Sequence, residues 1–376
     1  MSLNNPVSAP IPAAERTESR VETAVPAEVT ALIGRRRHQE RATFAAERGQ
    51  GIESCASVHN ANPLFWDDAV AAELTGGPIL PPTTLSLWSR PHSWAPGATE
   101  EPVPLRLHFE LKAMLDLPDA VVTQAAMRFG EPVRPGDVMT HAQTLRSVSD
   151  EKVTALGTGR FWVIDVDYTN QRDEPIGTES ITGFGYRRTD PPMSVDPAPT
   201  DDDNDGDDVG GRGGQEDGGH GPRLVGEVAV GDRLPALGHD VTVSTVVLGA
   251  VAARDWRPMH HDPEFARARN GVADVFLDTP TQAAWFERYL TDWAGPTGRL
   301  GRLDLRMGRP VVAGDSMVLA GAISAVEVDA AGCGWVSVEV VLTVGDEARS
   351  SARARLAIPV AAADNPWSRH GSDWLP

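Results

Sequence analysis

The 376-residue sequence is poor in cysteine, with only Cys55 and Cys333, which are far apart and outside any CxxC pair. Two isolated cysteines give no disulfide framework, so we expect a reducing compartment, the cytoplasm. No apolar run reaches the roughly 18 residues of a membrane span, and we expect no membrane partner. The N-terminal residues lack a basic segment followed by an apolar one, so they do not resemble a secretory signal.

Positive charge is also scarce. The chain has 34 Lys and Arg against 53 Asp and Glu, a net charge of −19, which argues against nucleic acid as a partner. Ten acidic residues and two arginines lie between Asp190 and Arg223, so this segment alone carries −8. It has almost no large apolar residues, and we predict a disordered, Gly-rich linker there. A calcium loop starting at Asp201 is the alternative, but Arg212 stands where such a loop needs Glu.

The sequence does contain a repeat. The segment 128–139 returns at 306–317, 178 positions later, with Arg, Gly, Pro, Val, Gly, Asp and Met at matching places. Seven identities in twelve positions without low complexity indicate a duplicated domain. The predicted parts are a disordered tail over 1–25, a domain over 26–189, the linker over 190–222, a second domain over 223–360 and a loose tail over 361–376.

Each copy of the repeat precedes sequence that alternates as antiparallel hairpins do. The strand-like segments are 159–169 and 178–188 in the first half, and 335–343 and 349–359 in the second. Ahead of these strands we expect one long helix in each half; in the second half it covers 281–293, where apolar residues recur at helical spacing. The pattern favours an α+β architecture in which an antiparallel sheet wraps around a central helix, twice.

One short segment is a candidate for chemistry. Asp255 and His260 are five residues apart, and Pro258 opposes helical geometry between them, so their side chains should flank a turn. A carboxylate and an imidazole that converge can hold and polarise one water molecule. On spacing alone, two solvated loop residues are the commoner outcome. A zinc site with His261 and Asp262 is another alternative, but adjacent side chains seldom point at one centre. We therefore predict no metal.

These residues resemble a known family, the MaoC-like (R)-specific enoyl-CoA hydratases and dehydratases. The resemblance is carried by Asp255, Pro258, His260, Asp262, Pro263 and Ala266, and then by Pro310, Gly314 and Asp315. The segment 289–296 looks like actinobacterial acyl dehydratases of steroid side-chain degradation. In the first half, 62–67 and 77–83 resemble the dehydratase-like domain that accompanies them. The resemblance covers about 28–188 and 224–360 and implies two hotdog domains, a double hotdog.

The resemblance implies that Asp255 and His260 hold the water that adds across a trans-2-enoyl-CoA, without a cofactor. Pro280 has no N–H, so the oxyanion donor at the helix start would be the backbone of Thr281. The implied substrate is an acyl-CoA with a bulky, steroid side-chain acyl group, and the implied assembly is a homodimer of double-hotdog chains. Docking of a thiolase or lipid-transfer partner stays open. A dehydratase of short or branched acyl-CoA and a non-catalytic acyl-thioester binding module are the alternatives.

In the first half Asn60 and Phe65 stand where the second has Asp255 and His260, so the resemblance implies a catalytically silent domain. We expect it to wall a pocket for the acyl chain.

Three further residues are expected to bind substrate. Trp88 would contact the acyl group, while Arg302 and Arg306, with Arg299 and Arg309 beside them, would meet the CoA phosphates. The alternatives are a core position for Trp88 and an ordinary solvated strand face for the arginines.

Overall fold

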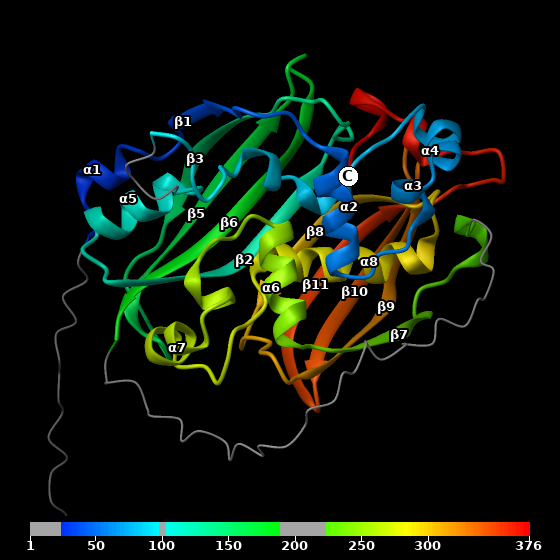
Figure 1. The fold of residues 1–376 in the computed structure, drawn as a ribbon. Helices are drawn as coiled ribbons and strands as arrows, with labels where there is room; N and C mark the ends of the chain where they lie inside the picture. The colour runs from blue at the N-terminus through cyan, green and yellow to red at the C-terminus, as the bar shows by residue number, and fades with distance from the viewer. Residues whose placement is uncertain (1–23, 98–102, 189–222) are drawn as a thin grey trace, which may run out of the picture.

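The computed structural model describes residues 24–97, 103–188 and 223–376. The linker predicted over 190–222 and nearly all of the tail predicted over 1–25 lie outside these described residues. Helices and strands follow one another in separate runs along the chain, as the α+β prediction requires (Figure 1). None of the helices in this part of the chain is long and apolar enough to cross a membrane.

The first half supplies six strands and several short helices. Its strands are β1 (Arg36–Arg41), β2 (Asp119–Phe129), β3 (Thr140–Val148), β4 (Lys152–Thr154), β5 (Gly157–Thr169) and β6 (Pro175–Arg187). Its helices are α1 (Ala27–Thr30), α2 (Arg48–Ser57), α3 (Pro63–Trp66), α4 (Asp68–Thr75), the 3₁₀ turns η1 (Pro82–Thr84) and η2 (Leu87–Ser89), and α5 (Arg106–Met114).

The second half repeats this order around a longer helix. Its strands are β7 (Arg233–Asp240), β8 (Arg299–Met307), β9 (Ser316–Val328), β10 (Gly334–Val344) and β11 (Glu347–Ala357). Its helices are η3 (Val225–Glu227), α6 (Val243–Ala252), η4 (Pro258–His260), α7 (Pro263–Phe265), the π-helical η5 (Ala266–Asn270), α8 (Thr279–Ala294), η6 (Pro366–Ser368) and η7 (Gly371–Asp373).

The strands form one sheet, and corresponding strands of the two halves follow in the same order from each outer edge to the centre. The order is β1-β3-β5-β6-β2-β8-β11-β10-β9-β7, with β4 beside β5, so β2 and β8 join the halves. Across this junction Gln124 pairs with Arg306 and Arg128 with Arg302. At the repeat offset of 178, Gln124 corresponds to Arg302 and Arg128 corresponds to Arg306. Each of the two first-half residues therefore pairs with the residue that corresponds to the other. The duplication therefore folds as a pseudo-twofold pair, with both predicted hairpins in place.

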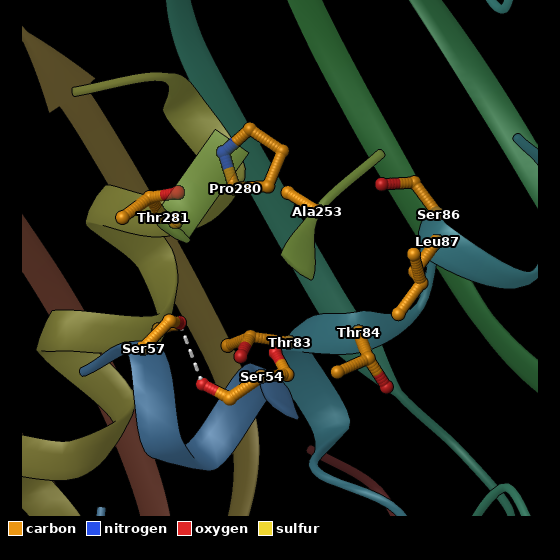
Figure 2. A pocket seen from close by; sticks show the side chains of 11 residues that line it. Ser54, Ser57, Thr83, Thr84, Ser86, Leu87, Ala253, Pro280 and Thr281 are labelled. Atoms are coloured by element: carbon orange, nitrogen blue, oxygen red, sulfur yellow. Dashed lines mark hydrogen bonds between the residues drawn. The ribbon is translucent and has the colours of Figure 1, made fainter. Parts of the chain in front are cut away.

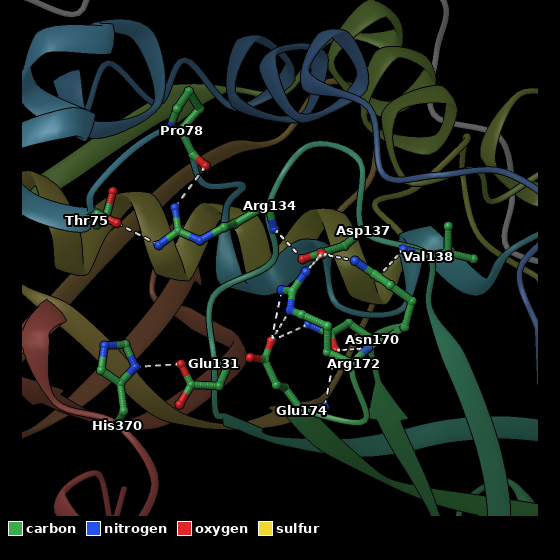
Figure 3. A network of polar contacts seen from close by, with 11 residues as sticks. Thr75, Pro78, Glu131, Arg134, Asp137, Val138, Asn170, Arg172, Glu174 and His370 are labelled. Atoms are coloured by element: carbon green, nitrogen blue, oxygen red, sulfur yellow. Dashed lines mark hydrogen bonds and ion pairs between the residues drawn. The ribbon is translucent and has the colours of Figure 1, made fainter.

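The repeated motif makes the same turn twice. Gly136 and Gly314 have φ values of 93° and 97°, a left-handed conformation that favours glycine. The next residue, Asp137 or Asp315, accepts a hydrogen bond at 2.9 Å from the backbone N–H three positions earlier. In the first half Arg134 extends the network, donating to the carbonyls of Thr75 and Gly77 at the end of α4 (Figure 3).

Among the described residues, the expected long helix is present in the second half only. The prediction over 281–293 is confirmed by α8, a helix of 16 residues that lies across the sheet (Figure 1). In the first half the prediction is wrong. Leu80 and Leu277 donate to the equivalent carbonyls of Val133 and Val311, so the segments that follow correspond. After Leu80 the described residues form η1, η2 and then the nine-residue α5, because prolines at 81, 82 and 91 interrupt helical geometry.

The tail after Val360, expected to be loose, packs against both halves. Trp367 and Trp374 are 6% and 5% exposed. Arg299 donates to the carbonyls of Pro366, Arg369 and Gly130, and its guanidinium lies 3.6 Å from the Trp374 ring centroid. These contacts correct the prediction of a loose tail. The burial of two large aromatic side chains stabilises the packed tail relative to a solvated one.

Candidate active site

Asp255 and His260 flank a turn, as the proline between them predicts. Asp255 follows shortly after the end of α6, where its N–H donates to the Ala250 carbonyl, and Pro258 begins the 3₁₀ turn that holds His260. The two side chains are 3% and 2% exposed, and 3.9 Å separates Asp255 Oδ2 from His260 Nε2. This distance is too long for a direct hydrogen bond but suits two groups that share one water molecule.

The hydrogen bond of His260 assigns its tautomer. Nδ1 lies 2.7 Å from the Phe276 carbonyl, which can only accept, so Nδ1 carries the proton of the neutral ring. Nε2 then presents its lone pair toward Asp255. This atom is buried, and no group in the described part of the chain hydrogen-bonds to it. The geometry leaves Nε2 free to accept a proton.

Two arginines fix the Asp255 carboxylate. Arg257 Nε donates to Oδ1 at 2.8 Å and Nη2 to Oδ2 at 2.6 Å, while Arg90 Nη1 lies 3.4 Å from Oδ2. Burial alone would raise the pKa of Asp255, but the charge and hydrogen bonds of Arg257, with Arg90, outweigh it. The pKa therefore lies well below its ordinary value, and the carboxylate is ionised at neutral pH. The spacing of the motif gave no signal for Arg90, which comes from the other half.

A cavity of about 850 Å³, part of it open solvent, lies beside Asp255 and Arg257. Its first-half lining includes Arg90 after η2, His108 on α5, His141 on β3, Tyr168 on β5, and Glu179 and Ile181 on β6. The cavity lies where the first half has η1, η2 and α5 in place of one long helix. The second half closes the cavity with Thr279 and Pro280 at the start of α8.

The structure places three predicted substrate-binding residues outside the cavity lining. Trp88 is fully buried in the first-half core, and its Nε1 donates to the Thr84 hydroxyl at 3.1 Å. Leu303 and Leu305 point into the second-half core, so the alternating Arg302 and Arg306 lie on the opposite face of the sheet from α8.

The neighbouring arginines are likewise engaged elsewhere. Arg302 pairs with Asp304, Arg309 pairs with Glu347, and Arg299 holds the C-terminal tail. A solvated strand face, the alternative interpretation, is the one that the structure supports for Arg302 and Arg306.

The predicted oxyanion donor is also wrong. Thr281 donates its N–H to Asp278 Oδ1 at 2.7 Å and its hydroxyl to Oδ2 at 2.8 Å, so Asp278 is the N-cap of α8 and occupies that N–H. Gln282 N–H is taken by the Asp278 carbonyl. Thr279, the first residue of α8, lines the cavity, and its N–H contacts no acceptor among residues that the structure describes.

The first half holds a structural counterpart of the Asp255 turn. His59 and Arg254 share a left-handed φ, 54° and 51°, and the next residues, Asn60 and Asp255, each donate at 2.8 Å to the carbonyl five positions earlier. Phe65 then lies where the second half has His260, in an apolar cluster with Trp367. The backbone thus supports the alignment of the two motifs, and the acid–base pair is absent from the first.

A second, smaller pocket adjoins the cavity and shares Ser86 and Pro280 with it. Side chains of α2, η1 and the start of α8 line this pocket, and several of them carry hydroxyl groups (Figure 2). Below it, Glu287 of α8 accepts hydrogen bonds from the Thr83 N–H, at 3.0 Å, and from the Thr83 hydroxyl. Complete burial raises the pKa of Glu287 to about 7. The part of the chain described contains no His, Cys, Asp and Glu cluster suited to a metal ion.

Comparison with known proteins gives consistent relatives. Residues 31–179 match the family model of the FAS1-like dehydratase domain region. The chain is 36% identical over 119 residues to the 3-oxo-4,17-pregnadiene-20-carboxyl-CoA hydratase beta subunit of Mycobacterium tuberculosis, covering 31% of this chain and 88% of that protein. It is 30% identical over 128 residues to a probable enoyl-CoA hydratase alpha subunit of Thermomonospora curvata, covering 33% of this chain but only 39% of that longer protein.

Solved structures show the same fold. A MaoC-like dehydratase superposes with a TM-score of 0.65 at 18% identity, covering 89% of this chain and 100% of its own. A double-hotdog protein of Mycobacterium tuberculosis superposes with a TM-score of 0.57 at 13% identity, covering 86% and 96%. The double hotdog is thus confirmed, and fold and relatives together define a hydro-lyase. More particularly, the chain belongs to the MaoC-like enoyl-CoA hydratase family.

Proposed function

We propose that the protein hydrates a trans-2-enoyl-CoA thioester at Asp255 and His260 and yields a 3-hydroxyacyl-CoA. The observation that carries this proposal is the 3.9 Å approach of the free His260 Nε2 to the ionised Asp255 carboxylate. Between these two acceptors a water molecule can donate one hydrogen to each, and its oxygen lone pair is then directed toward C3 of the substrate.

The same two residues account for the proton transfers of the reaction. As the water oxygen bonds to C3, His260 Nε2 takes one water proton and the C2=C3 electron pair moves toward the thioester carbonyl. The resulting enolate is protonated at C2 by the His260 imidazolium, which restores the neutral ring. Asp255 accepts the hydrogen that stays on the new hydroxyl and stabilises the transient imidazolium. The reverse sequence dehydrates the product with the same groups.

The start of α8 supplies stabilisation for the enolate oxygen. The Thr279 N–H is the free donor at the positive end of the helix dipole, and it lines the same cavity as Asp255. In this proposal it replaces Thr281, whose N–H is taken by the Asp278 cap. A preorganised backbone donor at that point lowers the barrier, because charge develops on the oxygen only as the bond to C3 forms.

We propose a bulky acyl group, with a steroid side-chain thioester as the first candidate. The support is the cavity beneath the first-half sheet, where η1, η2 and the short α5 stand in place of one long helix, together with the pregnadiene substrate in the name of the mycobacterial relative. In this proposal the first half is catalytically silent and walls the acyl pocket.

The test follows the absorbance of the conjugated thioester when purified protein is given crotonyl-CoA or a steroid enoyl-CoA. We expect absorbance loss with the steroid substrate, and His260→Ala should reduce kcat/KM by about 10²–10⁴-fold. His261→Ala, at the exposed adjacent histidine, is the matched control and should retain the rate. No absorbance loss with either substrate, or full activity in His260→Ala, would contradict the proposal.

A further inference from the structure

We propose that the cavity holds a second polar subsite, for an uncharged oxygen substituent of the acyl group remote from the thioester. Its residues are His141, Tyr168 and Glu179, and its ligand is a hydroxyl or keto group. The inference rests on the proposed function for the acyl-CoA class of its ligand, and on the cavity itself for the rest. The three side chains lie on β3, β5 and β6, neighbouring strands of the first-half sheet, and all three line the cavity.

His141 is the clearest sign of a missing ligand contact. It is 6% exposed, it pairs with Tyr168 across β3 and β5, and the two rings are 6.3 Å apart. Its Nδ1 is buried, and no hydrogen-bond partner for that atom exists among the residues described. A buried polar atom without a partner is unfavourable, so this nitrogen calls for a hydrogen-bond partner from outside the chain. Burial also lowers the pKa of His141, which keeps the ring neutral.

Tyr168 and Glu179 are the other two residues of the subsite, and with His141 they form a row across the three strands. The Tyr168 hydroxyl is 3.3 Å from Glu179 Oε2, and the two side chains are 3% and 7% exposed. Burial raises the pKa of both groups. Together with His141 they offer donors and acceptors to one small oxygen function, which matches a hydroxyl or a ketone.

The charged groups of the lining already interact with one another. Arg90 and Arg257 both pair with Asp255, and the charge of Arg90 also acts on Glu179. A charged substituent of either sign would therefore meet a like charge as well as an opposite one. The intervening lining is apolar, with Val166 and Ile181 beside the polar row, so the body of the acyl group is apolar and only its far end is oxygenated.

Binding is measured first, since it does not depend on turnover. The full-length protein is titrated by calorimetry with pairs of saturated acyl-CoAs that differ only in a terminal hydroxyl or keto group. The pairs span a series of linear chain lengths and one polycyclic acyl group. We expect the oxygenated member to bind about tenfold tighter in the pairs whose length reaches the row.

Variants locate the effect. Tyr168→Phe and His141→Phe, which keep the aromatic volume, should each reduce the oxygen preference to about threefold or less. His141→Gln keeps a polar end and should restore part of it. Tyr186→Phe is the matched control, because Tyr186 is a buried tyrosine of β6 outside the cavity lining, and it should leave the preference unchanged.

The outcomes separate this subsite from the proposed reaction. Equal or weaker binding of every oxygenated member, or a preference that survives both Phe variants, would overturn the subsite. Hydration of the unsubstituted enoyl-CoAs alongside that result would leave the reaction standing. Conversely, an oxygen preference in binding without any hydration would support the subsite and refute the hydratase. If both hold, kcat/KM of the paired enoyl-CoAs should follow the binding preference.

Discussion

Arg257 gives the Asp255 carboxylate one orientation, because Nε and Nη2 each bind a different oxygen. A carboxylate held this way keeps further lone pairs for water, but its depressed pKa makes it a weak base. His260, whose Nε2 is free, is the better proton acceptor of the two. The division of labour in the proposed mechanism follows from this contrast: Asp255 orients the water, and His260 moves the proton.

Glu287 makes stability depend on pH. Its ordinary pKa of 4.5 rises to about 7 on burial, so the folded state retains a proton that the unfolded chain releases. This contribution is fully present below pH 4.5 and is lost as pH rises through 7. The loss amounts to about 3 kcal/mol by pH 7–8. Glu287→Gln removes the titration and keeps an acceptor for Thr83.

We therefore expect the free energy of unfolding, from urea titrations, to fall more steeply between pH 5 and 8 in the native protein than in Glu287→Gln. Glu53→Gln, an exposed position on α2, is the control and should keep the native slope. Parallel pH profiles for the native protein and Glu287→Gln would show that Glu287 ionises normally in the folded state.

The start of α8 depends on one cap. Asp278 accepts from the Thr281 N–H and hydroxyl and is 2% exposed, so Asp278→Ala should lower the free energy of unfolding by about 1–2 kcal/mol. Asp262→Ala removes the equivalent cap of the three-residue α7, at an exposed site, and should have a smaller effect. Urea denaturation of both variants checks the difference. Equal losses would mean that the buried position of the α8 cap adds nothing.

The elements show what sequence pattern could and could not predict. Period-2 alternation predicted both hairpins, and helical spacing predicted α8, because each pattern records which side of an element is buried. The long helix expected in the first half is interrupted instead, because the prolines near η1 oppose helical geometry. Local chemistry was the better guide there than the repeat.

The site divides in the same way. The turn between Asp255 and His260 follows from Pro258, a local signal. Arg90 joins Asp255 only through the fold, from a segment more than 160 positions away. Arg302 and Arg306 were assigned to substrate by charge alone, and strand alternation places them on the far face of the sheet. The face of the sheet to which a side chain points depends on the tertiary structure. The positions of basic residues in the sequence do not give it.

At the level of the whole chain, the C-terminal tail joins the two halves. Trp374 packs on Arg299 and Trp335 and donates from Nε1 to the Phe129 carbonyl at 2.6 Å. Trp374→Ala should lower the free energy of unfolding by about 3–5 kcal/mol, through the cavity and the lost contacts. Urea denaturation checks this value. Trp94→Ala, at a side chain 69% exposed, should change it little. A Trp374→Ala loss as small as that of the control would return the tail to the loose role first predicted.

The pseudo-twofold fold contains two equivalent positions for a site, and the two positions differ. Beneath the first-half sheet the cavity is open beside Asp255. Beneath the second-half sheet the corresponding space is occupied by α8, whose Trp285, Phe286 and Tyr289 are buried in the second-half core. The two halves thus differ in two ways. The first half lacks the acid–base pair, and the second half leaves no space for an acyl chain beside the first-half turn at Asn60.

This difference predicts the result of restoring the lost pair. Asn60→Asp with Phe65→His, on a His260→Ala background, should give no measurable hydration of any enoyl-CoA, because the new pair would face α8 and the apolar cluster around Trp367, with no space for an acyl chain. The absorbance assay of the conjugated thioester measures it, with His260→Ala alone as the background. Thermal unfolding must first show that the triple variant is folded. Turnover above that background would mean that α8 can move aside, and that the missing pair alone had silenced the first half.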